Sequence, residues 1–393
     1  MNTIQLHSCG AGCLPDCAAV GKARQAVASR SSSELTVDVH CHAFVPAVEL
    51  LVADQPARLA EKSAFDRSTG LASVQHNQQY MLPAAAPRLT SLSARLADMD
   101  AMGVDIQLIS PSPSQYNNWA PPALAEQLVT LQNEAIAGLC AEQPARLLGL
   151  GAVSLQHPQL AVKQLDVAVR QLGLRGVEIS TCIAGRELSD ETFAPFWARA
   201  EALGCVVFIH PFGSSLGPRL QQHYLSNLIG QPLETTIALS HLIFSGTLDR
   251  HPGLKLLAAH GGGYLPFYPG RSDHGYRLRP EAAGCAKAPS EYLGQIWFDS
   301  LVYQPQALRA LIAQVGISQV VIGTDYPFDM GSYDLHQLLA ELTELTAEQR
   351  IALLHGNAAR LLGIPLPLNG DAVSSAAVQP NTYHFGKGET LHG

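Results

Sequence analysis

Apolar, β-branched runs alternate with segments of helical periodicity through most of this 393-residue chain, from residue 35 to about residue 364. Parallel strands need helical crossovers, so this alternation predicts a parallel sheet and an α/β fold. The expected strands cover residues 35–43, 104–110, 147–154, 175–180, 205–210, 255–260, 296–302 and 319–324. The expected helices cover residues 122–142, 158–172, 191–203, 231–249, 305–315 and 333–354.

A count near eight strands favours a closed (β/α)8 TIM barrel, which takes about 250 residues plus insertions. The competing architecture is an open doubly wound sheet. That fold usually carries a G-x-G-x-x-G phosphate turn after its first strand, and the sequence has none there. We therefore expect the barrel.

The predicted barrel spans residues 35–365, with an insertion after its first strand. Residues 45–95 are rich in Pro, Ala, Gln and Ser and too long for one simple connection, so we expect an insertion or small lid above the barrel mouth. Residues 1–34 are dominated by small residues and are expected to be a flexible N-terminal extension, and residues 366–393 a C-terminal tail.

Charge and cysteine content exclude several classes of partner. The net charge is −8 without a dense Lys/Arg cluster, which disfavours nucleic acid and anionic membranes. No apolar stretch reaches the roughly 18–20 residues of a membrane span, and the N-terminus lacks the pattern of a secretory signal. Eight cysteines are too few for a disulfide scaffold, so a reduced, cytoplasmic setting is expected. Cys9, Cys13 and Cys17 leave a small metal clip open as an alternative to a loose extension.

Several predicted strands end in polar residues that their apolar bodies do not explain. The first ends in His40 and His42, the fifth in His210, the sixth in His260 and the eighth in Asp325. In a barrel the carboxyl ends of the strands converge on one mouth. Imidazoles and a carboxylate suit Zn²⁺ or a similar divalent ion. The set therefore predicts a metal site at that mouth.

The first strand, TVDVHCHAFV, carries an acid as well as two histidines. Strict alternation would place Asp38, His40 and His42 on one side and Cys41 with the two valines on the other. We therefore expect Asp38 to face the same place as the histidines.

Six motifs carry a resemblance to a known family: VDVHCHAFVP, RLADMDAMGVDIQL, VVFIHP, AHGGGYLPFYPGRSDHGY, GTDYPFDMG and LLHGNAARLLGI. They span nearly all of residues 35–364. The sequence resembles the amidohydrolase superfamily and, within it, the amidohydrolase-related branch. That branch includes the α-amino-β-carboxymuconate-ε-semialdehyde decarboxylases and the aromatic acid decarboxylases. The HGGG…GR…HG and TDYPF segments point to the muconate-semialdehyde side of the branch.

The resemblance implies that His40, His42, His210 and Asp325 bind the metal. Zn²⁺ is the expected ion and Mn²⁺ the alternative. It also implies that His260 stands near metal-bound water and acts in proton transfer, which suits an imidazole at physiological pH. Asp325 is the alternative acid or base, and the sequence leaves that choice open.

The resemblance also implies substrate-binding arginines. Arg271, in PGRSDHG, matches an arginine that reaches across a dimer interface to a substrate carboxylate, so a homodimer with a shared site is expected. A second family arginine is missing, because its position falls near Leu82–Pro83. Arg88 is the candidate substitute, ahead of Arg58 and Arg67.

Phe328, just after the aspartate of GTDYPF, is expected to touch the substrate, and Glu178 to support the site from the fourth strand. The expected function is a metal-dependent, non-oxidative decarboxylase of a small unsaturated or aromatic carboxylic acid. The alternative is a metal-dependent hydrolase of a C–C, lactone or amide bond, and a hydratase is a third option. A non-catalytic barrel would be expected to have lost a ligand, and none is lost.

Overall fold

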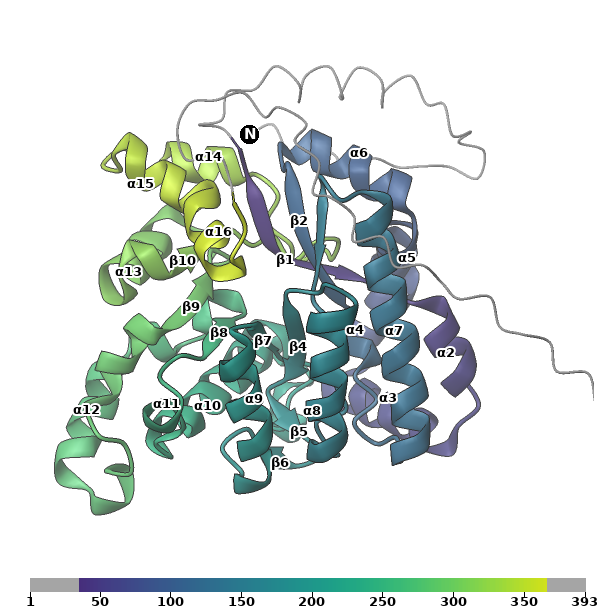
Figure 1. Cartoon of the computed structure of the whole chain (residues 1–393), viewed down its shortest axis with the longest axis horizontal. Helices are drawn as coiled ribbons and strands as arrows, with labels where there is room; N and C mark the ends of the chain where they lie inside the picture. The colour runs from purple at the N-terminus through teal and green to yellow at the C-terminus, as the bar shows by residue number, and fades with distance from the viewer. Residues whose placement is uncertain (1–34, 366–393) are drawn as a thin grey trace, which may run out of the picture.

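The structure is a computed structural model that describes residues 35–365 (Figure 1). The predictions for residues 1–34 and 366–393, including those for the three N-terminal cysteines, lie outside the described residues. Within residues 35–365 no helix is both long and apolar enough to cross a bilayer.

Parallel strands form the centre of the molecule, and helices surround them (Figure 1). Their bounds are β1 (Val37–Ala43), β2 (Ile106–Pro111), β3 (Leu147–Gly149), β4 (Gly176–Ser180), β7 (Val206–His210), β8 (Lys255–Ala258), β9 (Ile296–Asp299) and β10 (Val320–Val321). They pair in two parallel arcs, β1-β2-β3 and β10-β9-β8-β7-β4. A separate short hairpin pairs β5 (Cys182–Ile183) with β6 (Arg186–Glu187).

Backbone hydrogen bonds join the two arcs into a closed ring. On one side, the Gly151 N–H donates to the Gly176 carbonyl at 2.9 Å. On the other side, the Val39 N–H donates to the Ile322 carbonyl at 2.9 Å, and the Asp325 N–H to the His40 carbonyl at 2.8 Å. The predicted eight-stranded barrel is therefore confirmed, and the closure holds β1 beside the segment that follows β10.

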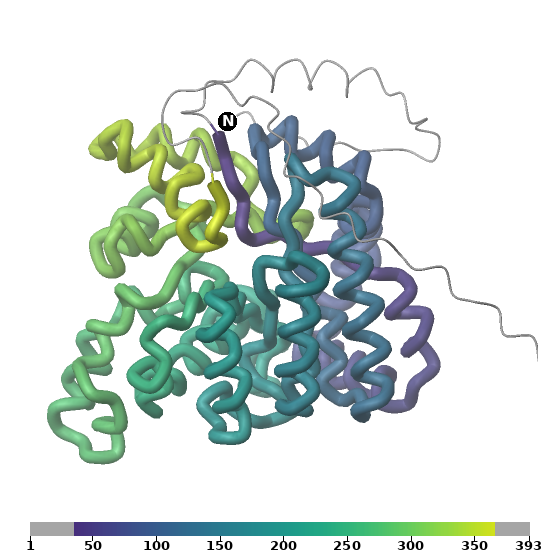
Figure 2. The backbone as a smooth tube through the Cα atoms, in the orientation of Figure 1, coloured from purple at the N-terminus to yellow at the C-terminus, as the bar shows by residue number. Residues whose placement is uncertain are grey.

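Helices cover the outside of the ring, as the continuous tube in Figure 2 shows. Their bounds are α6 (Leu92–Met102), α7 (Pro122–Glu142), α8 (Pro158–Asp166), α9 (Ala194–Leu203), α10 (Gln231–Phe244), α11 (Thr247–Arg250), α12 (Pro269–Leu278), α13 (Pro305–Val315), α14 (Leu335–Ala340), α15 (Ala347–Ile351) and α16 (Asn357–Leu362). The single helix expected over 333–354 is wrong, because α14 and α15 are separate. Helix α12 was not predicted, since it buries no residue and so shows no apolar face.

Between β1 and α6 the chain forms helices rather than an irregular connection. They are α2 (Pro46–Val52), α3 (Pro56–Thr69), α4 (Leu71–His76), the π-helical turn Asn77–Met81 and α5 (Leu82–Thr90). We call residues 46–90 the helical wall. Helix α6 connects β1 to β2 as the regular crossover helix of a barrel. The helical wall is therefore additional to the β1–α6–β2 unit.

The interior of the ring is packed. One cluster joins side chains from β1, β2, β7, β8, β9 and β10 with residues of α16. A cluster that reaches so many strands at once must lie inside the ring. The larger cluster joins the outer faces of the strands to the surrounding helices. The interior cluster includes Phe208, whose ring centroid lies 5.0 Å from that of His40. The interior core therefore supports the histidines from below.

The register of β1 against β2 shifts between Asp38 and Cys41. Val37 and Val39 pack in the interior cluster, whereas Cys41 packs in the outer one. The expected strict alternation is therefore wrong, because such an irregularity sends the residues that follow it to the opposite face. It turns His40 toward the interior together with the valines before it.

Asp38 consequently faces away from the histidines' site. Its carboxylate accepts hydrogen bonds from Gln107 Nε2 on β2 at 3.2 Å and from Thr324 Oγ1 at 2.6 Å. Burial raises the pKa of Asp38 to about 6. Asp38 thus ties β1 to both of its neighbours instead of serving the site.

Candidate metal centre and active site

Three imidazoles and one carboxylate meet at the mouth of the barrel. His40 and His42 come from β1, His210 ends β7, and Asp325 follows β10. All four are buried, and one ligand atom from each lies within 4.8 Å of the others. The Nε2 atoms of His40 and His42 each lie 3.4 Å from Asp325 Oδ1. Two ligands roughly 2.1 Å from a tetrahedral ion are about 3.4 Å apart, so the spacing suits a shared cation.

Unpartnered nitrogen atoms give a second test of whether these residues fit a metal. His40 Nε2, His42 Nε2 and both ring nitrogens of His210 are buried with no hydrogen-bond partner. Burying polar atoms without partners destabilises a fold unless something else ligates them. The four residues predicted from the sequence therefore form a group that is able to hold a metal ion.

Asp299, at the end of β9, holds two parts of this site together. His40 Nδ1 donates to Asp299 Oδ2 at 2.6 Å, so Nε2 is the nitrogen turned toward Asp325, where a metal would displace its proton. The same carboxylate accepts the N–H groups of His260 at 2.9 Å and Gly261 at 2.7 Å. The sequence analysis did not select Asp299. The signal that selected His210 and Asp325, a polar residue at the end of an apolar strand, applies to Asp299 as well.

Glu178 lies behind His42, where a supporting role was expected. Its Oε2 atom is 3.5 Å from His42 Nδ1, and Ser110 Oγ lies 3.2 Å from the same nitrogen. The Tyr116 hydroxyl donates to Glu178 Oε1 at 2.6 Å, and burial raises the pKa of Glu178. These contacts hold the ring of His42 from the side away from Asp325.

The charges of the site oppose the effect of burial. Burial alone would lower the pKa of His40, but the carboxylates of Asp325 and Asp299 raise it to about 10. Burial would raise the pKa of Asp325, but the imidazoles of His40 and His260 hold it well below its usual range. Burial and the neighbouring imidazoles lower the pKa of His210 well below its usual value, so this ring stays neutral. A neutral ring and an ionised carboxylate are the forms that bind metals.

His260 stands beside the four-residue group, in the turn that follows β8. Its Nε2 atom lies 3.8 Å from Asp325 Oδ2, and its ring centroid lies 5.1 Å from that of His210. Both His260 and Asp325 have left-handed backbones, with φ of 56° and 60°. Non-glycine residues adopt this conformation at a cost and cluster at functional sites.

The glycines after His260 make a tight turn. A Cβ atom on Gly263 would lie 1.9 Å from the Pro232 carbonyl oxygen. Of the two roles considered for these glycines, close approach to a ligand and a tight turn, the packing supports the turn.

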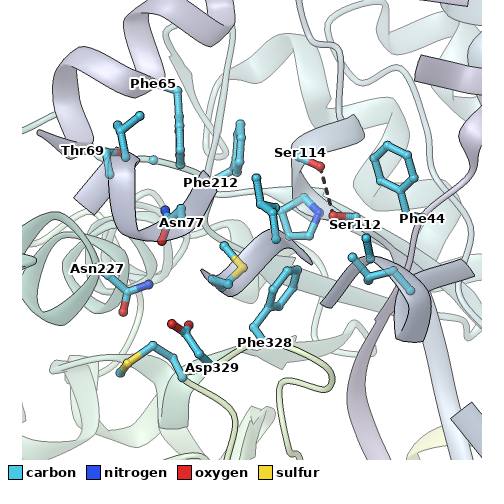
Figure 3. Close-up of a pocket in the computed structure, with 18 of the residues that line it drawn as sticks. Phe44, Phe65, Thr69, Asn77, Ser112, Ser114, Phe212, Asn227, Phe328 and Asp329 are labelled. Atoms are coloured by element: carbon cyan, nitrogen blue, oxygen red, sulfur yellow. Dashed lines mark hydrogen bonds between the residues drawn. The ribbon is translucent and has the colours of Figure 1, made fainter. Parts of the chain in front are cut away.

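A cavity of about 860 Å³ adjoins the four-residue group, and Figure 3 shows part of its lining. His210, His260 and Asp325 line it, and so do side chains of the helical wall. Phe328 lines it as expected, with its ring centroid 5.6 Å from that of His42. Phe65 of the helical wall stacks on Phe212, with centroids 4.7 Å apart.

The predicted arginines lie elsewhere. Arg88 Nε donates to Asp98 Oδ2 at 3.0 Å, and Arg88 is not among the described residues that line the cavity. The geometry therefore does not bring it to a substrate. Arg271 is exposed on α12 and also stays outside the cavity of its own chain.

The arginine in the cavity wall is Arg58, which the sequence analysis placed behind Arg88. Its guanidinium donates to Glu49 and Glu61, both at 2.8 Å. Leu82 and Pro83, where the resemblance expects an arginine, line the same cavity.

A closed (β/α)8 barrel with three histidines and an aspartate at its mouth defines a class, the metal-dependent barrel enzymes. The sequence matches the amidohydrolase family model over residues 37–364. The chain belongs to the amidohydrolase family, which confirms the resemblance drawn from its motifs.

Its relatives include decarboxylases. A 2-amino-3-carboxymuconate-6-semialdehyde decarboxylase from Dictyostelium discoideum is 37% identical over 272 residues, covering 69% of this chain and 76% of the relative. The crystal structure of a 5-carboxyvanillate decarboxylase from Sphingomonas paucimobilis is 26% identical, with a TM-score of 0.73 over 84% of this chain and 99% of that one. A 5-carboxyvanillate decarboxylase from Novosphingobium aromaticivorans, complexed with manganese and 4-hydroxy-3-methoxy-5-nitrobenzoic acid, is 22% identical, with a TM-score of 0.73, and covers 84% of this chain and 96% of that one.

Proposed function

We propose that this protein is a metal-dependent, non-oxidative decarboxylase of a small unsaturated or aromatic carboxylic acid. His40, His42, His210 and Asp325 would hold one divalent cation, Zn²⁺ or Mn²⁺. The observation that carries the proposal is a set of buried, unpartnered imidazole nitrogens directed at one carboxylate beside a largely apolar cavity.

A divalent cation held by these four residues would supply Lewis acidity toward an oxygen atom of the bound acid. Breaking the C–C bond releases carbon dioxide and leaves the electron pair on the substrate carbon. His260 lines the cavity and holds the proton that this carbon then takes up. The balance is one carboxylate and one proton in, and one C–H product and one carbon dioxide out.

Asp325 is the alternative proton carrier, because its Oδ2 atom lies 3.8 Å from His260 Nε2. We assign it to the cation, because its other oxygen lies 3.4 Å from two ligand nitrogens. His260→Asn would keep the metal content and abolish turnover if His260 supplies the proton. Turnover near the wild-type rate would instead place the acid on Asp325.

The direct test measures carbon dioxide from the full-length protein, stripped with a chelator and reloaded with Zn²⁺ or Mn²⁺. Three acids serve as probes: 2-amino-3-carboxymuconate-6-semialdehyde, 5-carboxyvanillate and 2,6-dihydroxybenzoate. We expect release from at least one of them, only after reloading. Full activity in the stripped protein would overturn the proposal. Oxygen from labelled water in the product would favour the hydrolase alternative.

We also propose a homodimer in which Arg271 of each subunit reaches the cavity of the other. Arg271 lies exposed on α12, which extends away from the barrel (Figure 1). Large apolar side chains near it are exposed, with Tyr268 at 70% and Leu278 at 63%. Exposed apolar surface of this kind is typical of an interface.

Mixing two inactive variants tests the shared site. Arg271→Ala and His210→Ala should each lack activity alone. After subunit exchange, half of the dimers would be mixed and each would hold one intact site, so about a quarter of wild-type activity should return. No recovery in dimers shown to have exchanged would contradict a shared site.

Two further proposals follow from the sequence. The helical wall, with the neighbouring residues of the 45–95 segment, would act as an insertion that covers the barrel mouth. The protein would work in the reducing cytoplasm, since Cys41, Cys140, Cys182, Cys205 and Cys285 are free thiols.

A further inference from the structure

Arg95 is a buried cation on α6 that takes no part in the proposed reaction. Only 2% of its surface is exposed. Its guanidinium donates to the side-chain oxygen of Gln107 at 2.9 Å, to the His42 carbonyl, and to the Arg88 carbonyl at 3.5 Å. All three acceptors are neutral oxygens. Replacing a buried ionic group by an apolar residue is often neutral or stabilising, so packing alone does not explain an arginine here.

The first of its contacts fixes the backbone of a proposed metal ligand. The His42 N–H donates to the Tyr326 carbonyl in the segment beside β1, at 2.8 Å. The next two residues of that segment give no donor in return, because Pro327 has no N–H and the Phe328 N–H donates within its own turn at 3.1 Å. Arg95 supplies a donor to the His42 carbonyl instead. A held carbonyl fixes the peptide plane beside the Cα atom and thereby the direction of the side chain.

The second contact reaches the segment that carries Asp325. The Cζ atom of Arg95 lies 4.9 Å from the ring centroid of Tyr326, within the range of a cation–π interaction. Tyr326 follows Asp325 directly in the chain and is fully buried. Its hydroxyl donates at 2.8 Å to Asp98, three residues after Arg95 on the same helix. Helix α6 therefore holds the neighbour of Asp325 at both its ring and its hydroxyl.

The third contact runs through Gln107 on β2. The oxygen of this side chain accepts from Arg95, and its amide nitrogen donates to Asp38 at 3.2 Å. Asp38 in turn accepts the His40 N–H at 3.1 Å. Arg95 is thus connected, directly or through neighbouring side chains, to the segments that carry three of the four proposed ligands.

We propose that Arg95 is a positioning residue of the metal centre. It holds His42 by its carbonyl and Asp325 through the next residue in the chain, so the ligand atoms of these two residues keep the 3.4 Å spacing that suits a shared cation. This inference rests on the proposed function, because it takes the metal centre from it, but it does not depend on which bond the enzyme breaks.

Arg95→Met tests the role, because methionine keeps a long side chain and removes every donor. The full-length protein is stripped of metal, and Co²⁺ affinity is measured by competition with a chelator. The visible absorption of bound Co²⁺ reports the arrangement of its ligands. We expect the affinity to fall about 10- to 100-fold and the absorption to change. Loss of a positive charge alone would strengthen cation binding, so an unchanged or raised affinity would overturn the inference.

Arg95→Lys keeps the charge but replaces the planar fork with an ammonium group, which cannot reproduce the paired contacts to His42 and Gln107. It should bind Co²⁺ more weakly than the wild type and more tightly than Arg95→Met. Wild-type affinity and absorption in Arg95→Lys would overturn the inference, whether or not Arg95→Met folds.

Arg146→Met is the matched control, because Arg146 also joins α6 to the chain that enters β2. It donates to Asp100 on α6 at 2.8 Å and to the carbonyls of Val104 and Asp105 at 3.1 and 2.7 Å. These residues precede β2, at the end of the barrel opposite the mouth. Both methionine variants should melt at a lower temperature than the wild type, but only Arg95→Met should change Co²⁺ affinity and absorption. Equal changes in both would reveal a general structural effect and overturn the inference.

Metal binding and turnover separate this inference from the proposed function. Wild-type protein that bound no metal would overturn the metal centre and the role of Arg95 with it. Metal-loaded wild type that released no carbon dioxide would overturn the decarboxylase alone, and weakened Co²⁺ binding in Arg95→Met would still support positioning. Normal wild-type turnover with unchanged Co²⁺ affinity in Arg95→Met would overturn only the positioning role.

Discussion

The metal centre and the helical wall enclose the same cavity but are built differently. The centre places His40, His42, His210 and Asp325 at strand ends, with at most 7% of each exposed. The wall consists of short helices that leave large apolar side chains in solvent, Leu50 at 82% and five others. Rigid strands suit a site that must keep its geometry, whereas helices added at the barrel mouth can change without disturbing the ring. Mutations at the metal centre should therefore change metal content and turnover, whereas mutations in the helical wall should change the binding of the acid.

The largest effect is expected at the centre. His210→Ala removes one of the four proposed metal ligands, and metal content should fall from about one ion per chain to near zero. Turnover should fall by more than about 100-fold, beyond the loss typical when only a supporting contact is removed. Metal analysis and carbon dioxide release measure the two effects.

His251→Ala is the matched control, because His251 lies outside the site and pairs with Glu201 at 3.0 Å. It should keep both metal and activity. A metal-free His251→Ala, or a metal-loaded and active His210→Ala, would contradict the assigned centre.

A smaller effect, also at the metal centre, is expected from Asp299→Asn. The His260 N–H donates to one oxygen of this carboxylate and the Gly261 N–H to the other, so the NH2 of an amide would stand against one of these two donors. Metal affinity and turnover should each fall about 10- to 100-fold while the barrel stays folded. Competition with a chelator gives the metal affinity, and circular dichroism checks the fold. Unaltered metal affinity would show that Asp299 does not position His40.

The smallest effect is expected in the wall. Phe65→Ala removes one ring of the stacked pair and should weaken binding of a bulky acid about five- to tenfold, because apolar contact area is lost. Metal content should not change. Arg67→Ala is the control, since Arg67 is exposed on the same helix and its guanidinium donates to the Ser63 hydroxyl. Loss of metal in Phe65→Ala would end the separation between the two regions.

The sequence predicted the barrel and the four residues that meet at its mouth, because both depend on local signals. Apolar runs mark strands, and a polar residue that ends such a run marks the barrel mouth. This logic placed His210 and Asp325 at the ends of distant strands and brought them together. The same logic could have found Asp299, which also ends an apolar strand.

The positions of the arginines, helix α12 and Asp38 depend on tertiary contacts, which the periodicity of the sequence does not reveal. Arg88 pairs with Asp98 and is held away from the cavity. Arg58 pairs with Glu49 and Glu61, which line the cavity with it. Helix α12 has no buried residue and so leaves no pattern to detect. The face taken by Asp38 depends on one irregularity in strand pairing, which alternation alone cannot reveal.

That irregularity makes one position of β1 expendable and its neighbour not. Val39 and His40 together stand opposite a single residue of β2, while Cys41 and His42 keep their partners on that strand. Deleting Val39 would restore regular pairing and leave His40 and His42 on the side of the mouth. Deleting His40 would restore the same pairing and remove one of the four residues that meet there, so two deletions of equal length should leave similar rings with different affinities for an ion.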